Sequence, residues 1–399
     1  MTRVSRRIML RAGIAASLFI PVAAHAQQRG AQAADSGGGR GRGRGPAITQ
    51  VGPGPTNTIT DVPGILVGHY ERFGEGYRSG TTVITTDSAR QVGPVRGMTA
   101  GYSQMGGAPG TKETDLLKPG GNVRAVQAIV LSGGSAYGLD ATTGVMRWME
   151  ERGFGFPVGG GVVPIVPGAI LFDLGRGGEF KKRPDAEFGY RAVSNASSRA
   201  VDMGRKGAGM GAGWGLGSAS VKLSNGYTVG AIVGLNPAGS PIDPKTCLPW
   251  ALSLELGSEF NLVAPTKEEC AAAAAGRGGP SDGSNNAPSN TTIAVVATDA
   301  PLSDLEAERM AVIANDGLSR AIKPIHGIGD GDTIFGLATT APAYNLTNQQ
   351  LGAVFNAAAD ALGRAVVEAV IQSHQVGTSR VGYCEQYKSA CRLRAAAKP

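Results

Sequence analysis

Histidine, cysteine and long apolar runs are scarce in this sequence of 399 residues. It holds 4 His and 4 Cys but no C-x-x-C pair, and three histidines (His69, His326 and His374) lie beyond residue 26. Zinc sites need clustered His and Cys ligands, so we expect no metal and no other cofactor. No stretch of 18 consecutive apolar residues occurs, so we also expect no membrane-spanning helix.

The main part of the sequence has no charge excess of either sign. The formal net charge of +7 comes from eight arginines and one aspartate that precede Ile48. Without these nine residues, the 38 basic and 31 acidic residues become 30 and 30. A nucleic-acid partner is therefore not expected, because it would require a basic face. Hydrophobic residues make up 42% of the chain, enough for a packed core rather than disorder throughout.

The first 26 residues have the pattern of a secretory signal. Basic residues come first, an apolar stretch covers 12–22, and Ala24-His25-Ala26 fits a cleavage site. The segment 5–11 (SRRIMLR) resembles a twin-arginine signal, although an ordinary Sec signal remains the alternative. Residues 27–47 are rich in Gly and Arg and are expected to form a disordered leader, with RNA binding as a weaker interpretation. A periplasmic or secreted location follows.

An exported protein can retain disulfides. Cys384 and Cys391 are seven residues apart, while Cys247 and Cys270 flank one apolar segment. We expect the disulfides Cys384–Cys391 and Cys247–Cys270, which is one of three possible connectivities.

The remaining sequence divides into a Gly-rich part (48–263) and a Gly-poor part that begins at residue 291. The first part has β-type runs at 128–131 and 227–233 and a helical pattern over 135–152. The second has buried-strand patterns at 292–297 and 333–338. Capping boxes at Ser303-x-x-Glu306 and Thr347-x-x-Gln350 open two amphipathic helices. Strands mixed with long helices indicate a layered α/β or α+β domain.

A low-complexity segment, 265–290, separates the two parts and is predicted to be a flexible surface loop. It leads directly into a strand that starts at Thr291. A threonine hydroxyl at such a junction can take over the acyl group of the preceding residue, and hydrolysis of that ester would leave Thr291 as a new N-terminus. The hydroxyl could then act as a nucleophile with its own amine as the base. On these residues alone, an ordinary β-residue after a linker is the simpler interpretation.

Several motifs together are more specific. In chain order they are 59–69 (ITDVPGILVGH), 80–83 (GTTV), 133–141 (GGSAYGLDA), 234–239 (GLNPAG) and 290–300 (NTTIAVVATDA). This set resembles peptidase family S58, which contains the L-aminopeptidase/D-esterases, the β-peptidyl aminopeptidases and the nylon-oligomer endohydrolases. The resemblance runs from about residue 57 to residue 382.

The resemblance implies an α+β fold: an αββα four-layer sandwich of the N-terminal-nucleophile-hydrolase type. It implies one domain built from a long chain that ends at Asn290 and a short chain of residues 291–399. Thr291 matches the family's nucleophile and Asn236 its oxyanion-hole residue. Tyr137 matches a tyrosine that lines the substrate site. Without the resemblance, Asn236 would be read as a turn residue and Tyr137 as a core aromatic.

Three further residues resemble the nylon-oligomer hydrolase branch. Asp330 and Asp332 form an Asp-Gly-Asp segment where the aminopeptidase branch has Ser-x-Glu, and Lys206 matches an active-site lysine. Two carboxylates around one Gly could hold the hydroxyl and amine of Thr291, and their repulsion should raise one pKa. The alternatives are a turn or a calcium loop for the aspartates and a surface position for Lys206. The Gly-x-Gly-x-Gly segment in 207–217 is interpreted as tight packing near the site, since it lacks the context of a dinucleotide motif.

The leading hypothesis is a self-processing amide hydrolase acting on peptides or 6-aminohexanoate-type oligoamides. An exported aminopeptidase that releases L-, D- or β-amino acids is the alternative within the family. Two other function classes remain. A non-enzymatic binding scaffold would stay a single chain after export, and a transferase would need an acceptor amine. The resemblance also implies a homo-oligomer of two-chain units.

Overall fold

The computed structural model describes residues 46–87, 91–92, 95–276 and 290–397. The predicted signal sequence, 1–26, and the leader up to residue 45 lie outside these ranges. No helix within them combines the length and the apolar character needed to cross a membrane.

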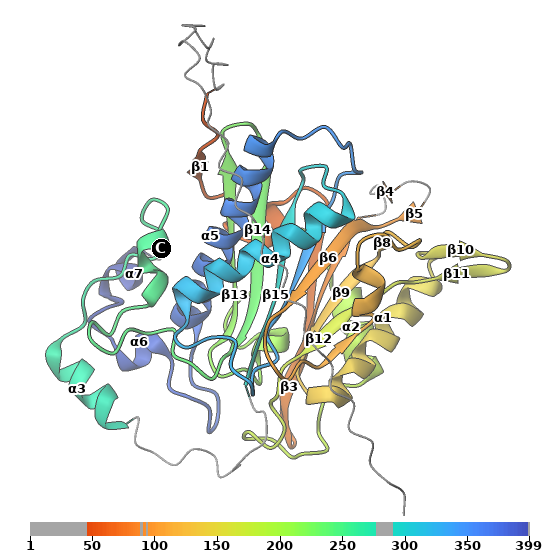
Figure 1. The fold of residues 1–399 in the computed structure, drawn as a ribbon. Helices are drawn as coiled ribbons and strands as arrows, with labels where there is room; N and C mark the ends of the chain where they lie inside the picture. The colour runs from red at the N-terminus through yellow and green to blue at the C-terminus, as the bar shows by residue number, and fades with distance from the viewer. Residues whose placement is uncertain (1–45, 88–90, 93–94, 277–289, 398–399) are drawn as a thin grey trace, which may run out of the picture. The chain divides into compact units, whose positions relative to one another are not determined.

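The larger sheet has seven strands and contains Thr291 in its central strand (Figure 1). Strand β15 pairs antiparallel with β14 on one side and parallel with β16 on the other. All other neighbours in this sheet are antiparallel. In spatial order the strands are β1 (Gln50–Gly52), β13 (Gly215–Leu223), β14 (Thr228–Asn236), β15 (Thr291–Thr298), β16 (Thr333–Ala338), β6 (Met98–Gln104) and β8 (Ala125–Val126).

The second sheet has five strands, of which β9 and β12 are parallel. Their spatial order is β2 (Ile65–Gly74), β3 (Tyr77–Thr86), β9 (Ala128–Ser132), β12 (Gly168–Ile170) and β7 (Thr111–Lys112). Two short ribbons stand apart from both sheets: β4 (Gln91–Val92) with β5 (Val95–Arg96), and β10 (Phe156–Val158) with β11 (Gly161–Val163).

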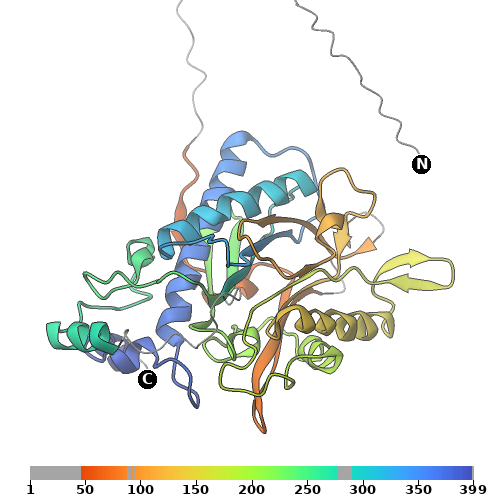
Figure 2. The same cartoon turned by 60° about the horizontal axis from the view of Figure 1, so that its bottom comes forward.

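Helices cover the outer face of each sheet, so the domain has four layers (Figure 2). Helices α4 (Asp304–Ala321) and α5 (Asn348–Gln372) pack on the seven-stranded sheet, and α1 (Ala141–Glu150) and α2 (Ala186–Ser194) pack on the five-stranded sheet. The expected αββα arrangement is confirmed. The short helices are η1 (Ile59–Asp61), η2 (Thr114–Leu117), η3 (Ser135–Asp140), η4 (Gly207–Gly209), η5 (Trp250–Leu254), α3 (Lys267–Gly276), α6 (Tyr383–Gln386) and α7 (Arg392–Ala397).

Strand β15 shows how the sequence specifies these layers. Its side chains alternate, with Ala294 and Val296 in the core under α4 and α5 and Ile293 and Val295 in the core between the sheets. Because successive side chains of a strand point to opposite faces, a strand buried on both sides reads as a continuous apolar run.

Both predicted capping boxes are present, at Ser303 before α4 and at Thr347 before α5. The helix predicted over 135–152 differs in its first part, which forms the 3-10 turn η3 before α1 begins at Ala141. Ser135 has a φ of 53°, a left-handed conformation that an α-helix does not accommodate.

The prediction of a flexible loop over 265–290 is wrong for its first part. Residues Lys267–Gly276 form helix α3. Thr266 Oγ1 accepts from Glu269 N at 3.2 Å, and Glu269 Oε2 accepts from Thr266 N at 3.2 Å, which closes a capping box. Alanine has the highest helix propensity, so the alanine run favours a helix and not a flexible linker. Residues 277–289 lie outside the described ranges.

The expected cysteine pairs are confirmed as Cys247–Cys270 and Cys384–Cys391. Both members of the first pair precede Asn290, and both members of the second follow Thr291. Neither disulfide therefore spans the Asn290–Thr291 bond.

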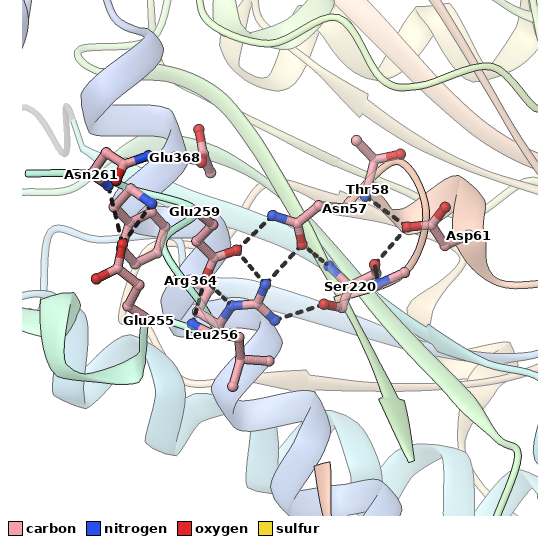
Figure 3. Close-up of polar contacts among 12 residues, drawn as sticks. Asn57, Thr58, Asp61, Ser220, Glu255, Leu256, Glu259, Asn261, Arg364 and Glu368 are labelled. Atoms are coloured by element: carbon pink, nitrogen blue, oxygen red, sulfur yellow. Dashed lines mark hydrogen bonds and ion pairs between the residues drawn. The ribbon is translucent and has the colours of Figure 1, made fainter. Parts of the chain in front are cut away.

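A buried polar cluster joins the sequence before residue 290 to helix α5 (Figure 3). Arg364 is fully buried and donates from Nε to Glu259 Oε1 at 2.6 Å and from Nη1 to Ser220 O at 2.6 Å. Its Nη2 donates to Asn57 Oδ1 at 2.8 Å and also contacts Glu259 Oε2. This cluster holds the two parts of the chain together without a covalent bond.

Candidate active site

The pairing of β14 with β15 brings Thr291 beside Asn236. They are direct partners in the register, at the end of β14 and the start of β15. Both side chains are buried, with Asn236 3% and Thr291 4% exposed. Residues 55 positions apart in sequence thus meet at one edge of the central sheet.

The hydroxyl of Thr291 lies against the peptide bond that precedes it. Thr291 Oγ1 donates to the carbonyl oxygen of Asn290 in a short contact. Asn290 in turn forms a parallel β-bridge with Asp330. The hydroxyl of Thr291 and the carbonyl of the Asn290–Thr291 bond are therefore held together.

The segment 330–332 wraps around this position. Asp332 Oδ1 accepts from Thr292 N at 2.7 Å, and Asp330 Oδ1 accepts from Ala238 N at 3.2 Å. Between them, Gly331 is so close that a Cβ added to it would lie 3.0 Å from Thr291 Oγ1. Asp332 thus fixes the backbone immediately after Thr291, Asp330 fixes the backbone two residues after Asn236, and the glycine leaves room for the hydroxyl.

Burial raises the pKa of the Asp330 carboxyl, and the nearby negative charge of Asp332 raises it further. Hydrogen bonds from Ala238 N and Gly327 N oppose this rise. The direction agrees with the expected repulsion between the two carboxylates, although burial is the larger cause.

Hydrogen bonds to other described residues hold Asn236 in one orientation. Its Oδ1 accepts from Gly213 N at 3.0 Å and from Arg176 Nη1 at 3.1 Å, and its Nδ2 donates to Phe172 O at 3.2 Å. A Cβ added to Gly213 would lie 3.1 Å from Asn236 Oδ1. The Gly-rich segment 207–217 therefore packs tightly against Asn236, as expected.

A cavity of about 420 Å³ opens beside Asn236 and Asn290. Among the described residues, its lining carries three guanidinium groups and no carboxylate; these residues are Arg78, Gly175, Arg176, Gly177, Gly211, Gly213, Trp214, Asn236, Pro237, Asn290, Thr378, Ser379 and Arg380.

Two further residues predicted for the site have other partners among the described residues. Lys206 Nζ pairs with Glu71 Oε1 at 3.3 Å and lines a separate cavity of about 660 Å³ with His69. Burial there lowers the pKa of His69 to about 4. Tyr137 is 54% exposed, with the Arg183 guanidinium 3.5 Å from its ring centroid and Phe180 edge-on at 6.4 Å. Within the described residues, no hydrogen bond or ion pair joins either residue to Thr291, and their place in the site stays a prediction.

Two residues beside the site had no role in the sequence analysis. His326 donates from N to Asp332 Oδ2 at 3.1 Å, and its Nδ1 lies 2.9 Å from the same oxygen. Arg176 contacts Asn236 as described above. The only signal for His326 in the sequence is its position, four residues before the Asp-Gly-Asp segment. Across the described ranges, no three His, Cys, Asp or Glu residues group in a way that could hold a metal ion.

Comparison with known proteins identifies the family. The sequence model of peptidase family S58 matches residues 57–382, so the chain belongs to this family. An uncharacterized aminopeptidase of Mycobacterium tuberculosis (strain ATCC 25618 / H37Rv) is 46% identical over 341 residues, which is 80% of this chain and 95% of the relative. A 6-aminohexanoate-oligomer endohydrolase of Agromyces sp. (strain KY5R) is 28% identical over 298 residues, which is 70% of this chain and 74% of the relative.

Solved structures agree on the fold. The L-aminopeptidase D-Ala-esterase/amidase of Ochrobactrum anthropi, described as a variant of the Ntn-hydrolase fold, matches with a TM-score of 0.62 at 22% identity. The match covers 88% of this chain and 97% of that one. A Burkholderia sp. β-aminopeptidase gives a TM-score of 0.61 with the same identity and coverage. The protein is therefore an amide-bond hydrolase with an Ntn-hydrolase fold.

Proposed function

We propose that this hydrolase cuts its own Asn290–Thr291 bond and then uses Thr291 as an N-terminal nucleophile. The observation that carries the proposal is the contact between Thr291 Oγ1 and the Asn290 carbonyl oxygen, in the uncut chain, at the start of a central strand. A hydroxyl in this position needs little movement to reach the carbonyl carbon.

The proposed self-cleavage has two steps, an acyl shift and a hydrolysis. Thr291 Oγ attacks the Asn290 carbonyl carbon, the C–N bond breaks, and the acyl group moves from nitrogen to oxygen as an ester. Water then hydrolyses the ester, which releases the Asn290 carboxylate and leaves Thr291 with a free α-amine. That amine has an ordinary pKa near neutrality and can accept the hydroxyl proton in later turnovers.

Hydrolysis of a substrate amide repeats this chemistry. Thr291 Oγ attacks the substrate carbonyl, the amine product takes the proton and leaves, and water hydrolyses the acyl-ester. Asn236 lies beside Thr291 and is assigned to stabilise the negative charge on the carbonyl oxygen. Asp330 and Asp332 fix the backbone around the nucleophile and supply negative charge close to its amine. Lys206 and Tyr137 are left out of the reacting group because they contact other residues.

For the substrate we favour an N-terminal residue of a short peptide or amide, since the 46%-identical relative is named an aminopeptidase. Oligoamides of the 6-aminohexanoate type are the second candidate, because Asp330-Gly331-Asp332 follows the pattern of that branch. We further propose export, for which both disulfides are suited, and assembly into homo-oligomers of two-chain units.

Intact mass and N-terminal sequencing of the purified protein test the proposal. We expect two chains, the smaller beginning Thr-Thr-Ile-Ala-Val. Thr291→Ala should stay a single chain and hydrolyse no amide, whereas Thr291→Ser should still be cut. Asn236→Ala should slow hydrolysis by about 10²–10³-fold. A folded wild-type chain that stays intact would overturn self-cleavage and the role of Thr291 as an N-terminal nucleophile. Assays with and without acceptor amines separate hydrolysis from acyl transfer.

A further inference from the structure

The cavity beside Asn236 has a composition that points to the charge of its occupant. Of the lining residues that belong to the described part of the chain, Arg78, Arg176 and Arg380 are cationic, and none is acidic. Asp330 and Asp332 do not line it. An anionic group is the natural partner for several guanidinium groups at one surface, because guanidinium and carboxylate form paired, charge-assisted hydrogen bonds.

The arginines are built into the fold. Arg78 is 7% exposed, and Arg380 stacks on the buried Trp214 with its guanidinium carbon 4.4 Å from the ring centroid. Behind them, the buried Arg205 donates from Nε to His374 O at 3.0 Å. Because burial and stacking restrict these side chains, the arginines keep their geometry when a ligand binds.

Electrostatic interactions within this group favour an incoming anion. Burial and the charges of Arg78 and Arg380 lower the pKa of Arg205 to about 10, so it remains protonated at neutral pH. Burial also lowers the pKa of Arg78; the charge of Asp173 raises it, and the charge of Arg176 lowers it further. Burial raises the pKa of the Asp173 carboxyl, while hydrogen bonds from Ser79 and Gly134 N and the charges of Arg78 and Arg176 oppose this rise. In the described part of the chain, Arg78 Nε is buried and has no hydrogen-bond partner.

The position of the cavity identifies which part of a substrate it meets. Asn290, which supplies the acyl group in the proposed self-cleavage, lines the cavity, and Thr291 does not. An external substrate forms its ester with the same hydroxyl, so its acyl group takes the place of Asn290. The cavity therefore lies on the acyl side of the bond that is cut.

We propose that the arginine cavity selects substrates whose acyl group carries a carboxylate, such as an N-terminal glutamyl residue. This inference rests on the proposed function, because it takes Thr291 as the nucleophile. The ammonium of such a residue would be on the side of Asp330 and Asp332, and its side-chain carboxylate on the side of Arg78 and Arg380.

Three substrates test it: the p-nitroanilides of glutamate, glutamine and lysine, each with a free α-amine, of which the first two are matched in side-chain length. The cleaved wild type should show a kcat/KM about tenfold or more higher for glutamyl than for glutaminyl, since hydrogen bonds between charged groups are the stronger kind. The lysyl substrate should be the poorest. The preference should shrink as salt is raised, because salt screens exposed charges.

Arg380→Gln removes one charge at the exposed rim of the cavity and should lower the glutamyl preference at least about threefold. Arg320→Gln, an exposed arginine paired with Asp360 outside the cavity, is the matched control and should keep it. Equal rates for glutamyl and glutaminyl substrates in wild type, or an unchanged preference in Arg380→Gln, would overturn the inference while leaving the proposed function intact. Hydrolysis by Thr291→Ala would instead overturn the proposed function.

A second measurement needs no turnover. Glutarate and its neutral diamide are added separately to the cleaved protein while Tm is recorded. We expect a rise in Tm with glutarate that is absent with the diamide and smaller in Arg380→Gln. The same Tm with both compounds would contradict a carboxylate site.

Discussion

The Arg364 guanidinium donates to both carboxylate oxygens of Glu259, with 2.6 Å between Nε and Oε1. The two residues come from opposite sides of the Asn290–Thr291 bond, and both are buried or nearly so. Because the remaining donors of Arg364 reach Asn57 and Ser220, a single side chain connects helix α5 to three separate segments of the preceding sequence.

Replacing Arg364 should therefore be costly. Arg364→Met leaves Glu259 buried without its partner, and we expect a loss of about 3–5 kcal/mol in the free energy of unfolding. Urea denaturation in the Thr291→Ala background, where the chain stays whole, measures it. Arg320→Ala breaks an ion pair of which the arginine is 49% exposed, and it should cost at most about 1 kcal/mol. Equal losses for the two variants would contradict the assigned importance of the buried cluster.

Gly331→Ala should slow self-cleavage. The added methyl group would lie 3.0 Å from Thr291 Oγ1 and 2.8 Å from Ala108 O. The segment 330–332 must therefore shift, and we expect this shift to displace the Thr291 hydroxyl away from the Asn290 carbonyl. We expect a reduction of about tenfold or more in the cleavage rate, followed by mass spectrometry after synthesis. Gly352→Ala, in α5 with open space around the new methyl, should cleave normally and gain up to about 1 kcal/mol in stability.

The pKa of Asp330 predicts a pH dependence of stability. Because its pKa is raised in the folded chain, the native state binds more protons than the unfolded state at pH values between the two pKa values, and stability falls as pH rises through that window. Asp330→Asn removes this slope. In the Thr291→Ala background, the stability of Asp330→Asn relative to its parent should improve from pH 4 to pH 7. Parallel stability curves for the two proteins would show that Asp330 has an ordinary pKa.

Lys206 provides a test that separates the family resemblance from the observed structure. If it acts on Thr291, Lys206→Ala should be strongly impaired in cleavage. Its pairing with the Glu71 carboxylate predicts a change within about fivefold, because partly exposed ion pairs contribute little. The rate of self-cleavage of Lys206→Ala, measured beside that of Asn236→Ala, decides between a direct role of Lys206 on Thr291 and its ion pair with Glu71.

The sequence predicted the elements that depend on local patterns. The strands at 292–297 and 333–338 and the capped helices α4 and α5 are recognisable from periodicity and caps. The family motifs indicate Thr291 and Asn236 as site residues, and the resemblance to the nylon-oligomer hydrolase branch adds Asp330 and Asp332. Helix α3 was missed because an alanine run was judged by its low complexity and not by its helix propensity.

The other differences arise from tertiary contacts. Tyr137 and Lys206 follow the family's motifs, but the direction of each side chain depends on Arg183 and Glu71, which are distant in sequence. Arg176 and Arg78 lie in segments with no motif, and only the packing of the two sheets places them at one cavity with Arg380.

The placement of the two disulfides has a thermodynamic consequence. Since neither pair spans the Asn290–Thr291 bond, a cut molecule that unfolds also separates into two polypeptides. Its unfolding then becomes a dissociation, governed by mass action, and the Tm of the cut protein should rise with protein concentration. The uncut Thr291→Ala chain unfolds as one molecule, so scission would turn an intramolecular folding equilibrium into an assembly equilibrium.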